Sequence, residues 1–257
     1  MALRLGSAGI VDDLGQGSAP GGCRVKDESA DRHCARISLR RDLFGRSSSP
    51  LMSHARTARV RVTRAYVGLG SNVGDPEKTL TAALHALAAL PSVRLRGVSS
   101  LYATRPVGVT DQPEFRNAVV ALDVPTGADP ATGATALLLA LKSLERAFGR
   151  QARRRWGPRE LDLDLLAFGR ARFSIDRPPG GRSDDPAKAS LPLTVPHPEA
   201  QGRLFVLAPL AELAARLVPP GWNETVESAR RRREHVEGAE AVRPVGRWDS
   251  AKGEWRR

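Results

Sequence analysis

Two aspartates, Asp162 and Asp164, lie one residue apart in the run RWGPRELDLDLLAFG. Leucines alternate with them, and this period of two is typical of a β-strand, whose successive side chains point to opposite faces. With the leucines in a core, both carboxylates lie on the other face, about 7 Å apart at Cα. Two such carboxylates repel each other unless a cation lies between them. Mg²⁺ fits, because it takes one or two carboxylates and completes its coordination with water and substrate phosphate.

The segment before this strand, GRQARRRWGPR, is rich in arginine. Five arginines could neutralise phosphate oxygens there: Arg150, Arg153, Arg154, Arg155 and Arg159. Carboxylates for a metal beside arginines for phosphates indicate phosphoryl-transfer chemistry. Two simpler interpretations stay open. A short D-x-D pair on an amphipathic strand is often only a solvated face, and the arginines at 153–155 fit a solvated charged loop.

Four blocks of the sequence, in this order, resemble the 6-hydroxymethyl-7,8-dihydropterin pyrophosphokinases of folate biosynthesis. The blocks are AYVGLGSNVGD, SSLYATRPVGVTDQPEFRNAVV, RWGPRELDLDLL and LTVPHP, and the third is highly specific to the family. The resemblance covers residues 64–219. It implies transfer of pyrophosphate from ATP to the hydroxymethyl group of the dihydropterin, with release of AMP. It also implies that Asp162 and Asp164 hold two Mg²⁺ ions and act in catalysis with Arg150 and Arg159.

The resemblance implies contacts to ATP as well. The residues at matching positions are Arg150, Arg159, Thr194, His197 and Arg203. His197 taken alone also fits a loop histidine capped by its neighbours. Some members of the family have a tyrosine where this chain has Pro198, and others have a basic residue where it has Pro192. The run GLGSNVGD lacks the lysine of a Walker A loop, which favours a structural turn beside the pterin pocket.

For the pterin ring, the resemblance implies stacking and an amide that reads the ring edge. Phe115 and Phe205 match the positions that sandwich the ring, as expected for aromatic side chains. Asn117 matches the side chain that pairs with the ring edge, since a carboxamide offers both donor and acceptor. The further pterin contacts are Thr104, Pro106 and Val107, and Trp156, which closes over the substrates. The two phenylalanines could equally be ordinary core residues.

Periodicity and breakers give the order of elements from residue 64 onward. The expected elements are a strand at 64–71, a helix at 79–90 ended by Pro91, a strand at 93–102, a Pro/Gly loop at 103–114, a strand at 115–124, a helix at 131–148, the aspartate strand, and a helix at 202–215 bent or interrupted by Pro209. The order β-α-β-β-α-β predicts an α+β, ferredoxin-like sandwich, in which helices pack on an antiparallel sheet. The family resemblance implies the same fold.

The segments before, within and after this unit differ in composition and in hydrophobic periodicity. Residues 1–60 lack periodicity and are expected to be a disordered extension, with translation beginning at Met52 as an alternative to Met1. The pyrophosphokinase domain is expected at 61–229. Within it, the Pro/Gly/Asp-rich stretch at 172–190 predicts a mobile surface insertion. Residues 230–257 begin with four arginines and predict a basic, disordered tail.

The net charge of +12 and a pI of about 10.9 favour acidic partners. An RNA-binding protein is therefore one alternative, although aromatic residues are only 5% of the chain and no RNP motif is present. A catalytically inactive relative that serves as an interaction partner is another. Cys23 and Cys34 fit neither a zinc site nor a disulfide scaffold, and no signal peptide or membrane-spanning stretch is evident. We expect a cytoplasmic monomer that binds ATP and the dihydropterin, without nucleic acid or membrane partners.

Overall fold

The structure is a computed structural model that describes residues 60–106, 111–149, 157–183 and 189–257. The predicted N-terminal extension, apart from residue 60, and the alternative start at Met52 lie outside these ranges. So do the arginines at 153–155 and three residues with predicted roles in the site, Val107, Arg150 and Trp156.

The described chain forms a βαββαβ unit followed by further elements. The strands are β1 (Val62–Ser71), β2 (Arg94–Val98), β3 (Leu101–Thr104), β4 (Phe115–Pro125), β5 (Asp162–Phe168), β6 (Phe173–Ile175), β7 (Leu193–Val195), β8 (Val242–Asp249) and β9 (Glu254–Arg256). The helices are α1 (Pro76–Ala88), α2 (Pro130–Ala147), α3 (Leu204–Ala214) and α4 (Val226–Glu237), with 3-10 turns η1 (Pro179–Gly181), η3 (Ala200–Gly202) and η4 (Ala239–Ala241).

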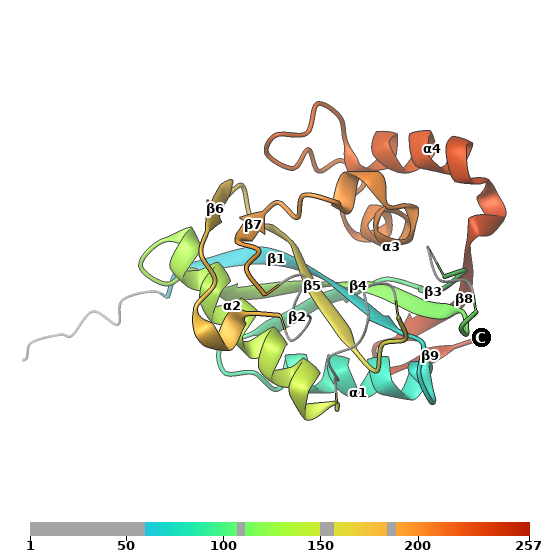
Figure 1. The fold of residues 1–257 in the computed structure, drawn as a ribbon, viewed down its shortest axis with the longest axis horizontal. Coiled ribbons are helices and arrows are strands. Elements are labelled where there is room, and N and C mark those ends of the chain that lie inside the picture. Colours follow the sequence, from blue (N-terminus) through green and yellow to red (C-terminus); the bar gives the residue numbers. More distant parts are fainter. Residues whose placement is uncertain (1–59, 107–110, 150–156, 184–188) are drawn as a thin grey trace, which may run out of the picture. The chain divides into compact units, whose positions relative to one another are not determined.

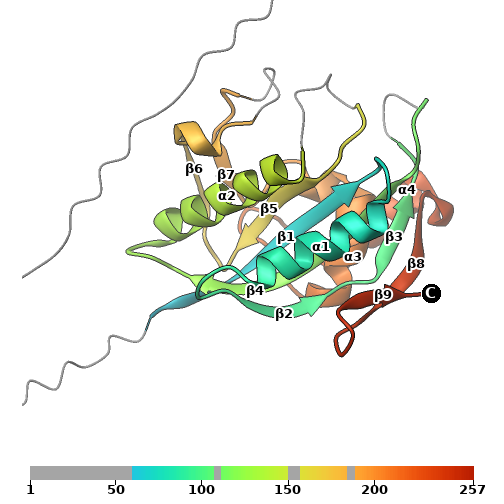
Figure 2. The same cartoon turned by 90° about the horizontal axis from the view of Figure 1, so that it is seen from below.

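One antiparallel sheet has the strand order β5-β1-β4-β3-β8-β9, and β2 also pairs with β4. Figure 1 shows α1 and α2 on one side of this sheet and α3 and α4 on the other. In the view of Figure 2, α1 and α2 both lie over the same face. The ferredoxin-like sandwich predicted from the sequence is confirmed. None of the helices in the described ranges has the length and apolar character needed to cross a bilayer.

Two hydrophobic clusters account for most of the packing between these layers, and a third, smaller one surrounds Leu204 of α3. The larger one fills the space between the sheet and α1 and α2, and includes Leu80, Leu84, Leu141 and the alternate residues of the central strands. The second joins the opposite face of the sheet to α3 and α4 through residues such as Leu207. The sheet is therefore apolar on both faces over much of its area, and polar side chains on the α3 face stand out against this background.

Both helices of the βαββαβ unit begin at an Asp-Pro pair. The carboxylates of Asp75 and Asp129 accept a backbone N–H in the first turn of α1 and α2. Proline follows each at the first helical position, where a missing N–H costs nothing. The helices predicted at 79–90 and 131–148 are confirmed, with α1 beginning earlier, at Pro76.

Two other predicted elements differ in detail. The strand expected at 93–102 is divided into β2 and β3, because the Ser99 hydroxyl accepts the N–H of Val119 at 2.9 Å and interrupts the regular ladder. The helix expected at 202–215 is α3, and it continues through Pro209 without interruption.

The prediction of a disordered tail over residues 230–257 is wrong. This segment contains most of α4 and the hairpin β8–β9, and β8 pairs with β3 to extend the sheet. The indole N–H of the buried Trp255 donates to the carbonyl of Ser99 at 3.1 Å. Three of the four arginines that suggested disorder pair with glutamates at helical spacing, and the fourth pairs with Glu224 before α4. Their charge therefore does not oppose folding.

The segment at 172–190, predicted as a mobile insertion, is anchored twice in its described part. β6 pairs with β7, placing Phe173 opposite Val195. The turn η1 packs on α2, where Arg146 Nη2 donates to the carbonyl of Gly180 at 3.1 Å. Residues 172–183 therefore have a defined course over α2, while residues 184–188 lie outside the described ranges.

Candidate active site

β5 presents its two aspartates on the face of the sheet that carries α3. The leucines that alternate with them are buried in the cluster below α1 and α2, whereas Asp162 and Asp164 are half-buried. The strand alternation predicted for this run is confirmed. In the pairing with β1, Asp162 lies opposite Gly70 and Asp164 lies opposite Gly68.

The two glycines of β1 leave the sheet surface beside the aspartates without side chains. Gly70 also lies opposite Asn117 of β4, so Asp162 and Asn117 flank it on the same face. A Cβ at Gly70 would lie only 2.9 Å from Asn117 Oδ1, whereas a Cβ at Gly68 would meet Leu166 at an ordinary 3.5 Å. The run GLGSNVGD is therefore not simply a turn beside the site, because its first glycines lie inside β1.

Three predicted pterin-contacting residues lie together next to this surface. Asn117 Nδ2 donates to Thr104 Oγ1 at 2.7 Å, and both side chains are buried. Phe115 lies opposite Thr104 and shares the face of Asn117. Among the described residues, no hydrogen bond occupies the second amide N–H or the carbonyl oxygen of Asn117, so both can serve a ligand. Pro106, half-buried, ends this part of the described chain.

α3 brings two further predicted residues over the same face. Phe205 packs partly buried against the clusters between α3 and the sheet. The Arg203 guanidinium lies 5.6 Å from the centroid of the Phe205 ring and forms an ion pair with Glu199. Phe115 and Phe205 are both half-buried, so neither is a fully enclosed core residue.

The segment that enters β5 is fixed by the end of β1. Asn72 Oδ1 accepts the N–H of Arg159 at 2.7 Å, and the N–H of Asn72 donates to the carbonyl of Arg159 at 3.0 Å. The Ser71 hydroxyl donates to the carbonyl of Glu160 at 2.7 Å. The amide of Asn72 also donates to the loop before β4. Ser71 and Asn72 thus hold the backbone around Arg159, while Asp75 caps α1.

The outer edge of β5 is held by a buried ion pair on α2. Glu145 Oε1 accepts the N–H of Leu163, the residue between the two aspartates, at 2.7 Å. Lys142 Nζ lies 2.8 Å from both carboxylate oxygens of Glu145 and 3.5 Å from the carbonyl of Leu163. Lys142 and Glu145 were not among the predicted site residues. Their signal was present, since two charged residues fall on the apolar stripe of the predicted helix.

The chain after β7 brings the predicted histidine to the end of β5. The N–H of His197 donates to the carbonyl of Leu166 at 2.9 Å. His197 Nδ1 accepts the N–H of Glu199 at 3.2 Å, so the neutral imidazole carries its proton on Nε2, where it can donate to an anion. Thr194 lies in β7 and its hydroxyl is 3.0 Å from that of Ser174 in β6.

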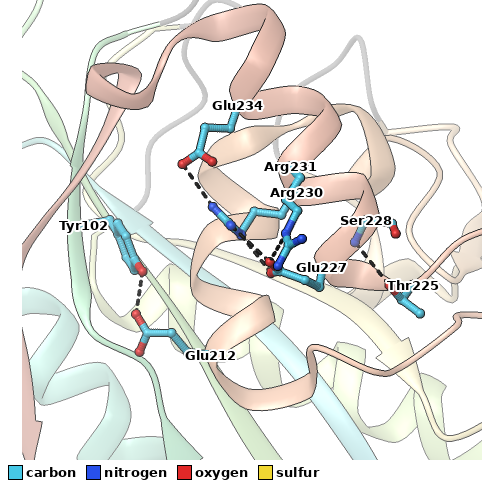
Figure 3. Close-up of polar contacts among 8 residues, drawn as sticks. All are labelled: Tyr102, Glu212, Thr225, Glu227, Ser228, Arg230, Arg231 and Glu234. Atoms are coloured by element: carbon cyan, nitrogen blue, oxygen red, sulfur yellow. Dashed lines mark hydrogen bonds and ion pairs between the residues drawn. The ribbon is translucent and has the colours of Figure 1, made fainter.

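The positive charge of α4 is largely paired within the protein. Figure 3 shows Arg230 between Glu227 and Glu234, and Arg231 on Glu227. The hydrogen bond from Arg230 holds the pKa of Glu227 at about 2, burial opposes this shift, and Arg231 reinforces it. The other two arginines of the run pair with glutamates as well. Four consecutive arginines therefore do not form an unpaired basic surface for nucleic acid.

A second contact in Figure 3 joins the sheet to α3. Tyr102 Oη donates to Glu212 Oε1 at 2.5 Å, and Glu212 Oε2 accepts the N–H of Ser100 at 2.8 Å. Burial raises the pKa of Tyr102, and the hydrogen bond to the Glu212 carboxylate raises it further. Tyr102 lies opposite Asn117. This contact thus fixes α3 beside the predicted ring pocket.

The donor set suits Mg²⁺ better than a metal that needs a complete protein cage. Within the described residues there is no group of three or more His, Cys, Asp or Glu that could hold an ion. Two carboxylates on one strand match the way Mg²⁺ binds through one or two carboxylates while substrate phosphates and water complete its coordination.

Comparison with known proteins identifies the family. The profile of the 7,8-dihydro-6-hydroxymethylpterin-pyrophosphokinase (HPPK) family matches residues 66–215, more than half of the chain. The chain belongs to the HPPK family. By family it is thus an ATP-dependent diphosphotransferase. The predicted resemblance is confirmed, and the matched region contains both aspartates, Asn117, His197 and Phe205.

Individual relatives agree with this membership. The chain is 44% identical over 171 residues to a 2-amino-4-hydroxy-6-hydroxymethyldihydropteridine pyrophosphokinase of Methylorubrum extorquens, covering 65% of this chain and 92% of the relative. It is 43% identical over 159 residues to the Pseudomonas aeruginosa protein of the same name, covering 62% and 85%. The HPPK-DHPS of Plasmodium falciparum shares the fold, with a TM-score of 0.55 and 13% identity. The match covers 76% of this chain and 48% of that one.

The structure brings together most of the residues expected to form an HPPK site. Those on or beside the α3 face of the sheet are Thr104, Phe115, Asn117, Asp162, Asp164 and Phe205, with Arg159, His197 and Arg203 in the adjoining segments. Arg150, Trp156 and Val107 belong to parts of the chain that the structure does not describe.

Proposed function

We propose that this chain transfers the pyrophosphoryl group of ATP to the hydroxymethyl oxygen of 6-hydroxymethyl-7,8-dihydropterin, releasing AMP, as a step of folate synthesis. Membership of the HPPK family supports the reaction. One structural observation carries the assignment of the site: Asp162 and Asn117 lie on one face with only Gly70 between them. This surface fits a polyphosphate near the aspartates and a flat ring near Asn117.

In this reaction the substrate hydroxyl attacks the β-phosphorus of ATP. A bond forms between the hydroxymethyl oxygen and the β-phosphorus, the bond from that phosphorus to the α–β bridging oxygen breaks, and the hydroxyl proton passes to solvent. Asp162 and Asp164 would hold two Mg²⁺ ions, which supply charge neutralisation at the phosphate oxygens when bound. The buried ion pair of Lys142 and Glu145 would keep the two carboxylates in register.

The remaining residues would bind and orient the substrates. Arg159 and Arg150 would donate to phosphate oxygens, for which a guanidinium is suited by charge and shape. His197 would add the Nε2–H donor, and Thr194 and Arg203 would complete the nucleotide contacts. These groups would surround the phosphates on the β5 side of the site, where charge develops as AMP leaves.

On the other side, the carboxamide of Asn117 would read the edge of the pterin. Thr104 orients this amide by accepting one of its N–H groups. Phe115 and Phe205 would stack on the ring faces. Backbone groups of the loop that contains Pro106 and Val107 would supply further hydrogen bonds, and Trp156 would close over both substrates.

The test is AMP release from ATP and Mg²⁺, with and without 6-hydroxymethyl-7,8-dihydropterin, for the wild type and Asp164→Ala. We expect pterin-dependent AMP that falls by about a hundredfold or more in the variant, as is common when one transition-state contact is lost. A folded wild type that releases no pterin-dependent AMP would reject the enzyme function and favour an inactive relative. Activity that survives in Asp164→Ala would reject the metal assignment only.

The nucleic-acid-binding alternative is less well supported, because the arginines of α4 are paired with glutamates. It predicts RNA affinity that falls steeply with salt. We also propose that the protein acts as a monomer, which sedimentation at assay concentration would test.

A further inference from the structure

Arg177 is a half-buried arginine that the proposed site does not use. It lies in the segment 172–190, between the strand β6 and the turn η1. Its Nε is buried and has no hydrogen-bond partner among the described residues. A buried guanidinium N–H without an acceptor is costly, so this donor is expected to find one in some state of the protein.

The course of the chain holds Arg177 in place from both sides. Before it, β6 pairs with β7, with Ile175 opposite Leu193. After it, η1 packs on α2, where the hydrogen bond from Arg146 fixes Gly180. Gly181 is buried, and a Cβ there would lie 3.1 Å from Leu138 of α2. Arg177 therefore projects from a segment that is anchored at Ile175 and at Gly180, rather than from a loose loop.

Arg177 lies near the outer edge of β5, because β7, the partner of β6, contacts β5, and η1 packs on α2, whose Glu145 holds Leu163 of β5. The nearby charges agree with this position. Burial lowers the pKa of its guanidinium, and the carboxylates of Asp164 and Glu145 counteract this shift. Arginine stays protonated in proteins, so a full positive charge is present there. No hydrogen bond or ion pair joins Arg177 to either carboxylate among the contacts of the described residues.

Neither carboxylate can serve as the permanent partner of this cation. Glu145 is already bonded to Lys142 and to the N–H of Leu163. Asp164 is committed to the metal under the proposed function. The acceptor that reaches a guanidinium beside a metal-binding carboxylate is then the group that the metal also binds, a phosphate oxygen.

We infer that Arg177 is a substrate-binding residue, which donates from the 172–190 segment to the polyphosphate of the nucleotide beside Asp164. This inference rests on the proposed function for the identity of the nucleotide. The inference gives the 172–190 segment a role. The two anchors of this segment hold a guanidinium near the site that the βαββαβ unit itself does not provide. Arg177 would contact the phosphates that the aspartate pair holds. A nucleotide that lacks these phosphates, such as AMP, should therefore bind equally well with or without the Arg177 side chain.

The experiment is calorimetric binding of a non-hydrolysable ATP analogue, and of AMP, in Mg²⁺, to the wild type and to Arg177→Gln and Arg177→Lys. We expect Arg177→Gln to bind the analogue about tenfold more weakly, equivalent to about 1.4 kcal/mol, and to bind AMP as the wild type does. Arg177→Lys keeps the charge and should recover part of the loss. Arg182→Gln is the matched control, because Arg182 is an exposed arginine of the same segment.

The outcomes distinguish three roles of Arg177: binding phosphate, supporting the fold, or acting as a counterion. Unchanged analogue binding by a folded Arg177→Gln rejects the inference, as does equal weakening for AMP and the analogue. If Arg177→Gln and Arg177→Lys lose affinity for the analogue and thermal stability to the same extent, Arg177 supports the fold only. If Arg177→Gln instead binds Mg²⁺ alone more tightly without losing the analogue, Arg177 is merely a counterion of Asp164. Pterin-dependent AMP release by the wild type is measured separately, so failure of the proposed function is recognised independently.

Discussion

Glu145 Oε1 accepts the backbone N–H of Leu163 at 2.7 Å, so a helix carboxylate holds the residue that separates the two aspartates. Lys142 neutralises this carboxylate, and the side chains of Lys142 and Glu145 are only 6% and 1% exposed. β5 is the last strand of the main sheet on this side. Its outer edge is therefore held by a buried ion pair at the point where the site needs a fixed backbone.

Glu145→Ala should lower the free energy of unfolding by about 3–5 kcal/mol, because it leaves Lys142 as a buried unpaired charge. The N–H of Leu163 would also lose its acceptor. We expect kcat to fall by about tenfold to a hundredfold, since small displacements of catalytic groups are costly. Urea unfolding and AMP release measure the two effects.

Two variants control this prediction. Lys78→Ala removes an ion pair whose lysine is 86% exposed, and should change stability by about 1 kcal/mol or less. The double variant Lys142→Met/Glu145→Leu should be less destabilised than Glu145→Ala, because no buried charge is left unpaired. A single variant as stable as the wild type would show that the ion pair does not hold β5.

Gly70→Ala should weaken pterin binding. The new Cβ would lie 2.9 Å from Asn117 Oδ1, so the amide must move away from the position in which Thr104 holds it. We expect KM for the pterin to rise by about tenfold with a smaller change in KM for ATP, and stability to fall. Steady-state kinetics with each substrate varied in turn give the KM for the pterin and the KM for ATP separately.

The matched variant is Gly68→Ala in the same strand. Its Cβ would meet Leu166 at 3.5 Å, an ordinary contact, and alanine loses less backbone entropy than glycine on folding. Stability should stay equal or rise by about 0.5–1 kcal/mol, and KM for the pterin should change little. Equal effects of the two substitutions on pterin binding would contradict the explanation by contact with Asn117.

The ion pairs of α4 should make part of the stability depend on pH. The folded-state pKa of Glu227 is about 2, chiefly through its hydrogen bond from Arg230, whereas an unfolded glutamate titrates near about 4.3. Because the folded value is the lower one, the stabilisation is complete above about pH 4.3 and is lost as the pH falls towards about 2.

We therefore expect wild type and Glu227→Gln to differ in free energy of unfolding at neutral pH and to converge between about pH 4.3 and 2. The difference should shrink in high salt, since the Glu227 side chain is 29% exposed. Chemical unfolding at several pH values gives both curves. Glu240→Gln removes one negative charge from an exposed position beyond α4 and serves as the charge-matched control.

The fold was predictable because local signals agreed with one another. Alternating leucines placed Asp162 and Asp164 on one face, and Asp-Pro pairs marked the starts of α1 and α2. The contacts that fix the site were not predictable in this way. Asn72 meets Arg159 from 87 residues away, and no local pattern announces such a bond. The charges of Lys142 and Glu145 on an apolar stripe were a readable signal of a buried ion pair.

The C-terminal segment was misjudged because charge density was taken as evidence against folding. The arginines of α4 are each matched by a glutamate, and Trp248 and Trp255 further on supply the apolar surface that a disordered tail lacks. Their ring centroids are 4.9 Å apart in an edge-to-face arrangement. Trp248 of β8 lies opposite Trp255 of β9, and aromatic pairs of this kind stabilise a hairpin.

Trp255 should therefore be essential to the stability of the domain. Trp255→Ala removes a buried ring and should cost about 3–5 kcal/mol, whereas Trp255→Phe keeps an aromatic ring and loses the hydrogen bond to Ser99, which costs about 1 kcal/mol. Thermal and urea unfolding give both values. Removal of residues 239–257 should lower Tm at least as much as Trp255→Ala, because β3 would lose β8, one of its two partner strands. A truncated protein with unchanged Tm would mean that the hairpin only rests on the sheet, and that the βαββαβ unit with α3 and α4 is stable without it.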